Sequence, residues 1–499
     1  KMTILIFMTS VYILPGVVLA SLPLSATTLS TTLGRVTGVR KVIGANRKID
    51  VFYNIPFAKP PVGGLRFKPP QSAEPWKGER DGTQKPNSCW QSVDTNFGRF
   101  PGVEIEDCLY INIWRPVCTQ HCSQQKQKSI LVWIFGGGFY SGTTTLDLYD
   151  ASQLAALNDV IVVSIAYRLG PLGFLYLGND DAPGNAGLLD QALGLKWVRD
   201  NAINLGGSPE SITIFGESAG AASVGFHLLS PVSRNYFHNA IMQSASPFAD
   251  WAVLERDVAK NRTLTLISRA LCSKNNISSS INCLRSLDPQ TLCDKQWILN
   301  AGVSFPFAPV IDGYFIPDHP LKMVEKGDVK NANILLGVNK NEGIYFNVYQ
   351  FQQDFPLKGD GHISNEQFDR ILPFYLKNDK KASDLIKEEY MKDSNSSYTQ
   401  LLDAITGDKS FKCPVLNFAS SLTRNGNNHV YTYSFEHRVS TNPWPAWSGV
   451  VHGYEIELIF GLPLAMSSVY TEEEKSLSLQ MMKLWTNFAK TGYALFVYK

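Results

Sequence analysis

The chain has 499 residues, of which 44% are hydrophobic and 11% aromatic, and its formal net charge is +2. This composition supplies enough apolar residues for a large buried core. Basic and acidic residues are interleaved, so nothing in the charge pattern predicts a nucleic-acid partner. The chain shows no internal repeat and no low-complexity tract.

The N-terminus has the pattern of a secretory signal peptide. One lysine precedes an apolar run over residues 4–19, and a small-residue cleavage pattern ends at Ala20. We therefore expect residues 1–20 to be removed, leaving a secreted or cell-surface protein without a membrane span. The alternative is an uncleaved membrane anchor, which Pro15 and Gly16 disfavour because they shorten the usable helix.

Glycosylation sequons and cysteines agree with export. The three sequons are at Asn261, Asn276 and Asn395. Eight cysteines in an exported chain should mostly pair. Two pairs would close short loops: Cys89 with Cys108, and Cys272 with Cys283. Cys118 and Cys122 flank a small polar insertion and could pair with each other, whereas Cys293 and Cys413 have no obvious partner.

Strand-like and helix-like segments alternate along most of the chain. Short and mostly continuous apolar runs, typical of strands buried on both faces, cover residues 130–135, 160–166, 212–215, 240–243, 334–338 and 430–435. Residues 188–201 and 219–229 have helical length and pattern. The alternation predicts an α/β fold, a large, mostly parallel sheet flanked by helices. Residues 345–410 are polar and lysine-rich, and we interpret them as a helical excursion within one catalytic domain spanning residues 27–499.

A candidate nucleophile lies at a strand-to-helix corner. The pentapeptide Gly216-Glu217-Ser218-Ala219-Gly220 directly follows the predicted strand 212–215 and opens the predicted helix. Glycines on both sides of a serine permit a strained corner that exposes the hydroxyl above the sheet. The pattern alone is weak, but this context makes Ser218 a nucleophile candidate.

A serine nucleophile needs a base and an acid. Glu342 lies just past the predicted strand 334–338, at the end of a sheet where such groups belong, although most loop glutamates are simply solvated. The base should follow the acid in the chain. Four histidines do so: His362, His429, His437 and His452. His452 lies beside Gly453 in a loop that could present its ring, which favours it without excluding the others.

The predicted strand 130–135 runs into Gly136-Gly137-Gly138. Adjacent glycines let bare N–H groups approach a developing oxyanion. A flexible turn is the alternative reading, but the position after a buried strand and upstream of Ser218 favours an oxyanion hole.

Five motifs together resemble the type-B carboxylesterase/cholinesterase family over residues 30–490. They lie at residues 106–114, 133–142, 216–220, 337–343 and 451–455. The resemblance implies an α/β-hydrolase fold, a Ser218–Glu342–His452 triad, and no metal or cofactor. It also implies the disulfides Cys89–Cys108 and Cys272–Cys283 and an oxyanion hole built from the N–H groups of Gly137, Gly138 and Ala219.

The resemblance leans towards the cholinesterase branch. Cholinesterases place aromatic residues around a deep gorge at positions that correspond here to Tyr140, Trp251, Tyr345, Phe346, Tyr349, Trp444 and Trp447. Aromatic faces bind quaternary ammonium groups by cation–π attraction. Glu217 and Asp94 would add negative charge at the base and mouth of the gorge. For Trp444 and Trp447 a packing role in the core is a serious alternative.

Two departures from the cholinesterase pattern point to a broader esterase. The loop from Cys89 to Cys108 lacks the segment that carries the main choline-binding tryptophan, and Trp90 is in the wrong place to replace it. Val303 stands where vertebrate acetylcholinesterases have phenylalanine, while Phe305 keeps its aromatic ring. The acyl pocket should therefore accept groups larger than acetyl.

We predict a serine carboxylesterase that hydrolyses short-chain esters through an acyl-enzyme, with neutral aryl esters hydrolysed at least as well as choline esters. One alternative is a true choline ester hydrolase. Another is a non-catalytic adhesion protein on the same fold, which the retention of all the catalytic motifs disfavours. Family members continue well beyond the predicted helix 477–489 and carry there a partner for Cys413, so we expect a truncated C-terminus and a free Cys413. The natural substrate and the oligomeric state, including a homo-oligomer, stay open.

Overall fold

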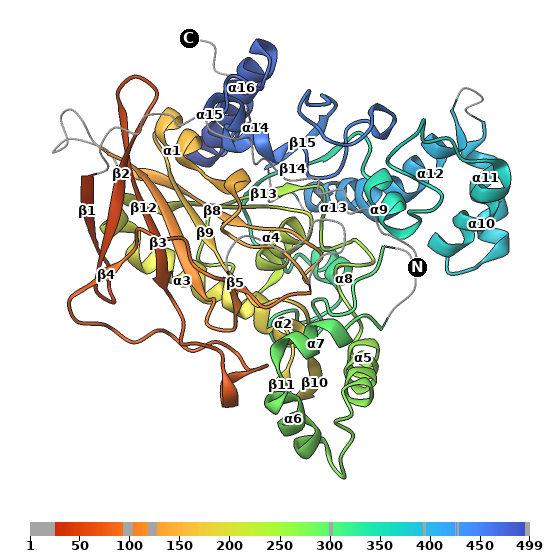
Figure 1. The fold of residues 1–499 in the computed structure, drawn as a ribbon, viewed down its shortest axis with the longest axis horizontal. Helices are drawn as coiled ribbons and strands as arrows, with labels where there is room; N and C mark the ends of the chain where they lie inside the picture. The colour runs from red at the N-terminus through yellow and green to blue at the C-terminus, as the bar shows by residue number, and fades with distance from the viewer. Residues whose placement is uncertain are drawn as a thin grey trace, which may run out of the picture.

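The central feature of the computed structural model is a large mixed sheet. The structure describes residues 25–92, 103–117, 127–298, 303–392, 396–424, 426 and 429–494. The strands of the sheet are β1 (Ser25–Ser30), β2 (Arg35–Ile43), β3 (Arg47–Pro56), β4 (Glu79–Asp81), β7 (Tyr110–Pro116), β8 (Lys128–Ile134), β9 (Ile161–Ile165), β12 (Gly207–Glu217), β13 (Asn239–Gln243), β14 (Asn333–Asn339) and β15 (His429–Phe435). Their order is β1-β2-β3-β7-β9-β8-β12-β13-β14-β15, with β4 paired to β2 (Figure 1).

The two halves of the sheet differ in strand direction. From β9 through β8 to β15 every pair is parallel, whereas β1, β2, β3, β7 and β9 pair antiparallel. All six predicted strands are confirmed and lie in the parallel half. The expectation of burial on both faces holds for β8, β9 and β13 but is wrong for β15, which is the edge strand and is largely exposed. The antiparallel half was not predicted.

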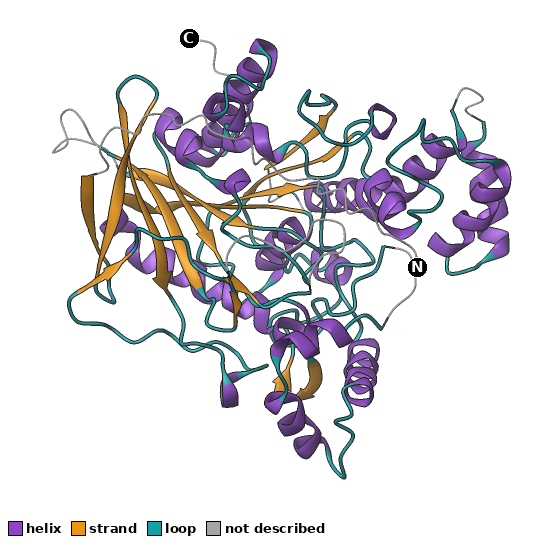
Figure 2. Cartoon of the chain, viewed as in Figure 1, coloured by secondary structure: helices purple, strands orange, loops and turns teal. Residues whose placement is uncertain are grey.

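Helices cover both faces of the sheet (Figure 2). They are α1 (Ser152–Asn158), α2 (Gly170–Phe174), α3 (Ala186–Leu205), α4 (Ala219–Leu229), α5 (Arg256–Arg269), α6 (Ile277–Ser286), α7 (Pro289–Lys295), α8 (Pro320–Glu325), α9 (Gly343–Gln350), α10 (Asn365–Tyr375), α11 (Lys380–Tyr390), α12 (Tyr398–Gly407), α13 (Cys413–Arg424), α14 (Ile456–Phe460), α15 (Leu462–Ala465) and α16 (Glu472–Thr491). The predicted helices are confirmed as α3, α4 and α16. Two small sheets, β5 (Ser88–Cys89) with β6 (Glu104–Ile105) and β10 (Tyr176–Asn179) with β11 (Ala182–Pro183), lie outside the main one.

The chain reverses its direction of travel across the sheet at β8. The connection through α1 leads to β9 on one side of β8, whereas the connection through α3 leads to β12 on the other side. Right-handed crossovers in opposite directions place their helices on opposite faces of the sheet. Loops that follow such neighbouring strands form a crevice at the carboxyl ends of the strands. The loops after β8 and β12 carry the glycine triplet and Ser218.

The polar segment predicted as a helical excursion forms α9 to α12, which project at the opposite end from β1 and β2 (Figure 1). Its buried side chains form a hydrophobic cluster of their own, centred on Phe368, Ile371 and Leu402. Trp444 and Val451, from the segment after β15, belong to the same cluster. The excursion therefore packs against the loop that carries His452.

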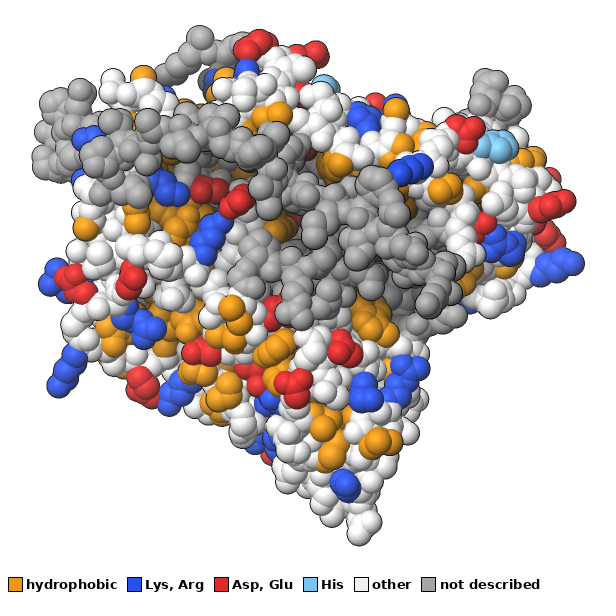
Figure 3. All heavy atoms as spheres, viewed as in Figure 1, with side chains coloured by type: hydrophobic (Ala, Val, Ile, Leu, Met, Phe, Trp, Pro, Cys, Tyr) orange, Lys and Arg blue, Asp and Glu red, His pale blue; other side chains and the backbone are white. Residues whose placement is uncertain are grey.

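Disulfides join Cys89 to Cys108 and Cys272 to Cys283. Among the described residues, Cys293 is buried and unpaired, and Cys413 is exposed and unpaired; Cys118 and Cys122 lie outside those residues. No described helix is long and apolar enough to cross a membrane. On the face drawn in Figure 3, the described basic and acidic side chains are interspersed, in keeping with the small net charge.

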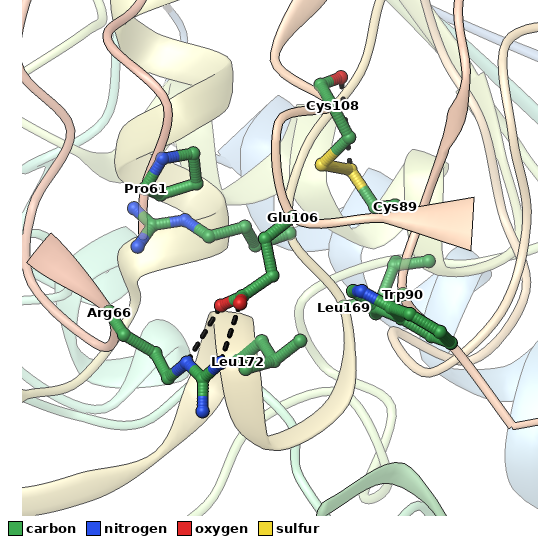
Figure 4. A pocket seen from close by; sticks show the side chains of 9 residues that line it. Pro61, Arg66, Cys89, Trp90, Glu106, Cys108, Leu169 and Leu172 are labelled. Carbon is green, nitrogen blue, oxygen red and sulfur yellow. Dashed lines mark hydrogen bonds and ion pairs between the residues drawn. A yellow bond between two sulfur atoms is a disulfide. The ribbon is translucent and has the colours of Figure 1, made fainter. Parts of the chain in front are cut away.

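A small pocket lies beside the first disulfide (Figure 4). Arg66 and Glu106 form a double hydrogen-bonded ion pair on its wall, with N···O distances of 2.7 and 2.5 Å. Trp90 also lines this pocket. None of the predicted catalytic side chains lines it.

Candidate active site

Ser218 occupies a strained corner between β12 and α4. Its backbone has φ 54° and ψ −124°, a region that non-glycine residues rarely adopt and that is found at nucleophile elbows. The flanking glycines are required by close packing, because a Cβ on Gly220 would lie 2.0 Å from the carbonyl oxygen of Ile134. The Ser218 N–H donates to the carbonyl of Gln243 at 2.8 Å, which fixes the corner against the end of β13.

The glycine triplet lies beside Ser218 because β8 and β12 are neighbours. Gly216 pairs with Ile134 in the sheet register, so the residues that follow β8 run past the elbow. A Cβ on Gly136 would lie 3.1 Å from the Cβ of Ser218. Gly137 and Gly138 have φ values of 108° and 59°, and among the described residues their N–H groups donate to no other part of the chain. Free N–H groups beside a serine hydroxyl can stabilise an oxyanion.

Glu342 and His452 are hydrogen-bonded to each other. The carboxylate Oε2 of Glu342 lies 2.6 Å from Nδ1 of His452, and both side chains are buried. Glu342 follows β14, and its other oxygen accepts from the N–H of Asn339 at 2.7 Å. A carboxylate on Nδ1 holds the imidazole with Nε2 facing outward, the orientation that a general base requires.

Glu217, the neighbour of Ser218, faces the other nitrogen of the same imidazole. Its Oε1 lies 3.1 Å from Nε2 of His452 but is not aligned for a hydrogen bond. Within the described residues, Nε2 has no hydrogen-bond partner, and Ser218 Oγ does not yet donate to it. Catalytic hydrogen bonds are often long or misaligned without substrate. The Nε2 atom therefore has no hydrogen-bond partner among the described residues and lies beside Glu217, the residue before Ser218.

Burial and the two carboxylates set the charge of this group. Burial lowers the pKa of His452, but the negative charges of Glu217 and Glu342 outweigh that effect and raise it. Burial raises the pKa of Glu217, although His452 opposes that shift. The two carboxylates thus favour the imidazolium form of His452.

A third buried carboxylate, Glu455, anchors the histidine loop, and the sequence analysis did not identify this role. Glu455 accepts from Gln243 Nε2 at 2.9 Å and from Asn339 Nδ2 at 2.6 Å. Asn339 also donates to the carbonyl of Val451 at 3.0 Å. Polar side chains at the ends of β13 and β14 were the available signal, because buried polar groups at strand ends need partners.

Comparisons with known proteins agree with this geometry. The model of the carboxylesterase family matches residues 25–494. The chain belongs to the carboxylesterase family. It is 44% identical to the cholinesterase of Mus musculus, with 93% of this chain and 79% of the relative covered. It is 43% identical to the acetylcholinesterase of Bungarus fasciatus over 93% of this chain and 78% of the relative. This carboxylesterase is a serine carboxylic ester hydrolase of cholinesterase-like character.

Aromatic side chains surround His452 in this carboxylesterase. The ring centroids of Phe346 and Tyr345 lie 5.2 and 5.9 Å from the imidazole. Phe411 lies closer, at 4.8 Å, and is fully buried. It stands on a π-helical turn, Asp408–Lys412, between α12 and α13. The sequence analysis missed Phe411, because nothing in the sequence at the end of the polar excursion marks this phenylalanine as facing His452.

A second aromatic group lies over the glycine triplet. The ring of Phe305 lies edge-to-face with Trp251 at a centroid distance of 5.3 Å and is tilted against Tyr140 at 5.7 Å. Tyr140 also contacts Trp297 at 4.9 Å, a partner that the sequence analysis missed. A Cβ on Gly138 would lie 2.6 Å from the ring of Phe305. These predicted pocket residues therefore meet at Gly138, one of the predicted oxyanion donors.

The remaining candidates have varied surroundings. Val303 is half-buried and packs against both hydrophobic clusters. Trp444 and Tyr349 contact Tyr345 at 5.5 and 4.6 Å, whereas Trp447 packs on Phe355 away from these rings. Its contact with Phe355 supports the packing role that was the alternative for Trp447. Two candidates, Asp94 and Asn395, lie outside the described residues.

Four histidines follow Glu342 in the chain, and among the described residues only His452 contacts it. His437 lies 3.4 Å from Glu474, and His429 bonds to Asn333 at 3.0 Å on the surface. The sequons Asn261 and Asn276 are exposed, and the side chain of Asn276 also caps α6.

Proposed function

We propose that Ser218, Glu342 and His452 are the catalytic triad of this carboxylesterase. The single observation that carries the proposal is the 2.6 Å hydrogen bond from His452 Nδ1 to Glu342, which leaves Nε2 without a hydrogen-bond partner beside Glu217, the neighbour of the strained Ser218. The oxyanion hole consists of the N–H groups of Gly137, Gly138 and Ala219. Ala219 begins α4, so the positive end of the helix dipole adds to its effect.

The first half of the reaction forms an acyl-enzyme. His452 takes the proton of Ser218 through Nε2 while Oγ attacks the ester carbonyl. Glu342 holds the ring and stabilises its positive charge. The tetrahedral oxyanion lies against the glycine triplet. Each N–H donor there lowers the activation free energy by about 3 kcal/mol. The alcohol then leaves with the proton from His452.

The second half releases the acid. Water gives a proton to His452 and attacks the acyl carbonyl, and Ser218 leaves as the proton returns to its Oγ. The same groups act in both halves, so no cofactor is required by the chemistry.

The substrates that we propose are short-chain esters, with neutral aryl esters hydrolysed at least as well as choline esters. Val303 beside Phe305 supports an acyl pocket wider than two aromatic residues would leave. The short segment between Cys89 and Cys108 supports weak selection for a choline cation.

A choline ester hydrolase is the second candidate. Two observations favour it. Relatives at 41–44% identity are named acetylcholinesterase or cholinesterase. Aromatic rings and the buried Glu217 also surround His452, and such rings bind quaternary ammonium groups.

We also propose that the protein is exported and glycosylated. Two disulfides and the exposed sequons Asn261 and Asn276 support a secreted or cell-surface protein. We take residues 27–499 as one catalytic unit, because the excursion packs against the loop that carries His452.

Covalent labelling tests the triad. An organophosphate probe should form an adduct on Ser218, located by peptide mass spectrometry, and the S218A variant should take no label. Kinetics with an acetylcholine substrate and a neutral isostere of the same acyl group then separate the two substrate proposals. A preference of 100-fold or more for the charged ester would replace the general esterase with the choline ester hydrolase.

A further inference from the structure

The loop that carries Glu342 and the loop that carries His452 are joined at Asn341. The Asn341 N–H donates to the carbonyl of Val450 at 3.0 Å, and its side-chain Oδ1 accepts from the Val450 N–H at 2.9 Å. A Cβ on Gly449 would lie 2.2 Å from that Oδ1, so the amide fits closely against the backbone before His452. Asn341 thus binds both polar groups of a residue two positions from the base.

The other end of the Asn341 amide binds Asp403 on α12. Asn341 Nδ2 donates to Asp403 Oδ2 at 2.7 Å, and the N–H of Ile344 donates to Asp403 Oδ1 at the same distance. Ile344 lies in the first turn of α9, whose N-cap residue is Glu342. Asp403 is 6% exposed. One buried carboxylate therefore binds the start of the helix that follows the acid and, through Asn341, the loop that carries the base.

The packing around Asp403 allows little adjustment. A Cβ on Gly343 would lie 2.2 Å from the Asp403 carbonyl oxygen and 2.6 Å from the nitrogen of Gly407. Helices α9 and α12 consequently meet backbone to backbone at this point. A carboxylate on such a rigid support holds its two partners at fixed positions.

We propose that Asp403 and Asn341 are positioning residues for hydrolysis, acting as a carboxylate–amide pair that sets the separation between Glu342 and His452. The inference rests on the proposed triad. Neither side chain touches the reacting atoms. Their effect is geometric: a shift of the histidine loop by about 1 Å can lower the rate about 100-fold.

The hydrogen-bonding capacities of the two side chains make a reciprocal test. In D403N, two NH2 groups face each other unless one amide flips. A flipped Asn341 loses its bond from the Val450 N–H, and a flip of the amide at 403 loses the bond from the Ile344 N–H. In N341D, two carboxylates face each other in a buried site. The double variant N341D/D403N restores every hydrogen bond, because the amide at 403 now donates and the carboxylate at 341 accepts from both sides.

The experiment measures kcat and KM for a neutral ester in the wild type, both single variants and the double variant, together with Tm. Each single variant should lose about 10-fold to 100-fold in kcat with little change in KM, and the double variant should recover most of that loss. D379N is the matched control, since Asp379 also caps a helix of the excursion, α11, but has no link to the histidine loop.

Each outcome decides the matter. Loss in the single variants and recovery in the double variant support the pair. Unchanged kcat in either single variant, or a double variant that is as slow as the singles while its Tm equals that of the wild type, overturns it. The H452A variant distinguishes a failure of the positioning pair from a failure of the proposed triad. If H452A keeps wild-type kcat, the proposed triad fails, whereas an inactive H452A with a fully active D403N rejects only the positioning pair.

Discussion

The carboxylate of Glu217 lies 3.1 Å from Nε2 of His452, the ring nitrogen that Glu342 does not bind. A negative charge at this position directly changes the pKa of His452, the proposed base. The ring must be neutral to accept the serine proton, so kcat/KM should fall as the pH drops through the pKa of His452. Glu217 raises that pKa because it stabilises the imidazolium.

The E217Q variant should therefore move the acid limb of the kcat/KM profile to lower pH, by about one unit or more. The measurement uses an uncharged ester, so that only the protein titrates. E210Q is the control, since Glu210 lies on the same strand but is exposed and faces His238. An acid limb that stays in place or moves upward would contradict the assigned role of Glu217.

Gly138 should be irreplaceable even by alanine. Its φ is 59°, and an added Cβ would lie 2.6 Å from the Phe305 ring, so the backbone that carries the Gly138 N–H would have to move. We expect G138A to lower kcat by about 100-fold to 1,000-fold, the effect of losing one oxyanion donor. G64A should have wild-type kcat, because the Cβ position of Gly64 has open space around it. Wild-type turnover in G138A would place the oxyanion hole elsewhere.

Val303 should control the size of the acyl group. It is half-buried next to Phe305, and a phenylalanine there would take up space in the pocket. In V303F, the ratio of kcat/KM for a butyryl aryl ester to that for the acetyl ester should fall about 10-fold, since small differences in fit of this kind are worth about 1–3 kcal/mol. V258F, at an exposed position on α5, serves as the control. An unchanged ratio in V303F would remove Val303 from the acyl pocket.

Much of the parallel half of the fold was predictable, because its strands are short apolar runs between helices. The antiparallel half was not. Strand β2 is partly exposed along most of its length and carries Arg40 and Lys41, so its composition does not distinguish it from a loop. The edge strand β15 was predicted from its sequence, but its exposure depends on which strands exist beside it, and a single segment contains no such information.

The candidate site also contains some residues that could be predicted from the local sequence and others that could not. Ser218 and the glycine triplet could be found because each has a local signature, a strained turn and a run of bare N–H groups. His452 could not be chosen over three other histidines from local pattern alone, since its contact with Glu342 joins residues 110 positions apart. Asp403 had no signature at all. Its role depends on α12 meeting the start of α9, which is a property of the packed chain.

Stability should depend on the ion pair between Arg66 and Glu106 beside the first disulfide. The two side chains are about nine-tenths buried, with exposed fractions of 7% and 13%. Arg66 also donates to the carbonyl of Leu287 at 2.6 Å and thereby ties the pair to α6. Removing one partner leaves a buried charge without compensation, so E106Q should lower the free energy of unfolding by about 3 kcal/mol.

Denaturant titration of E106Q measures this loss, with the exposed pair Lys196–Asp200 as the reference. The D200N variant should change the free energy of unfolding by less than about 1 kcal/mol, because water already solvates both charges. Neither change touches the proposed triad, so kcat of the folded fraction should remain at the wild-type value in both variants. Equal stability in E106Q and D200N would mean that Arg66 finds enough compensation in the backbone carbonyls alone.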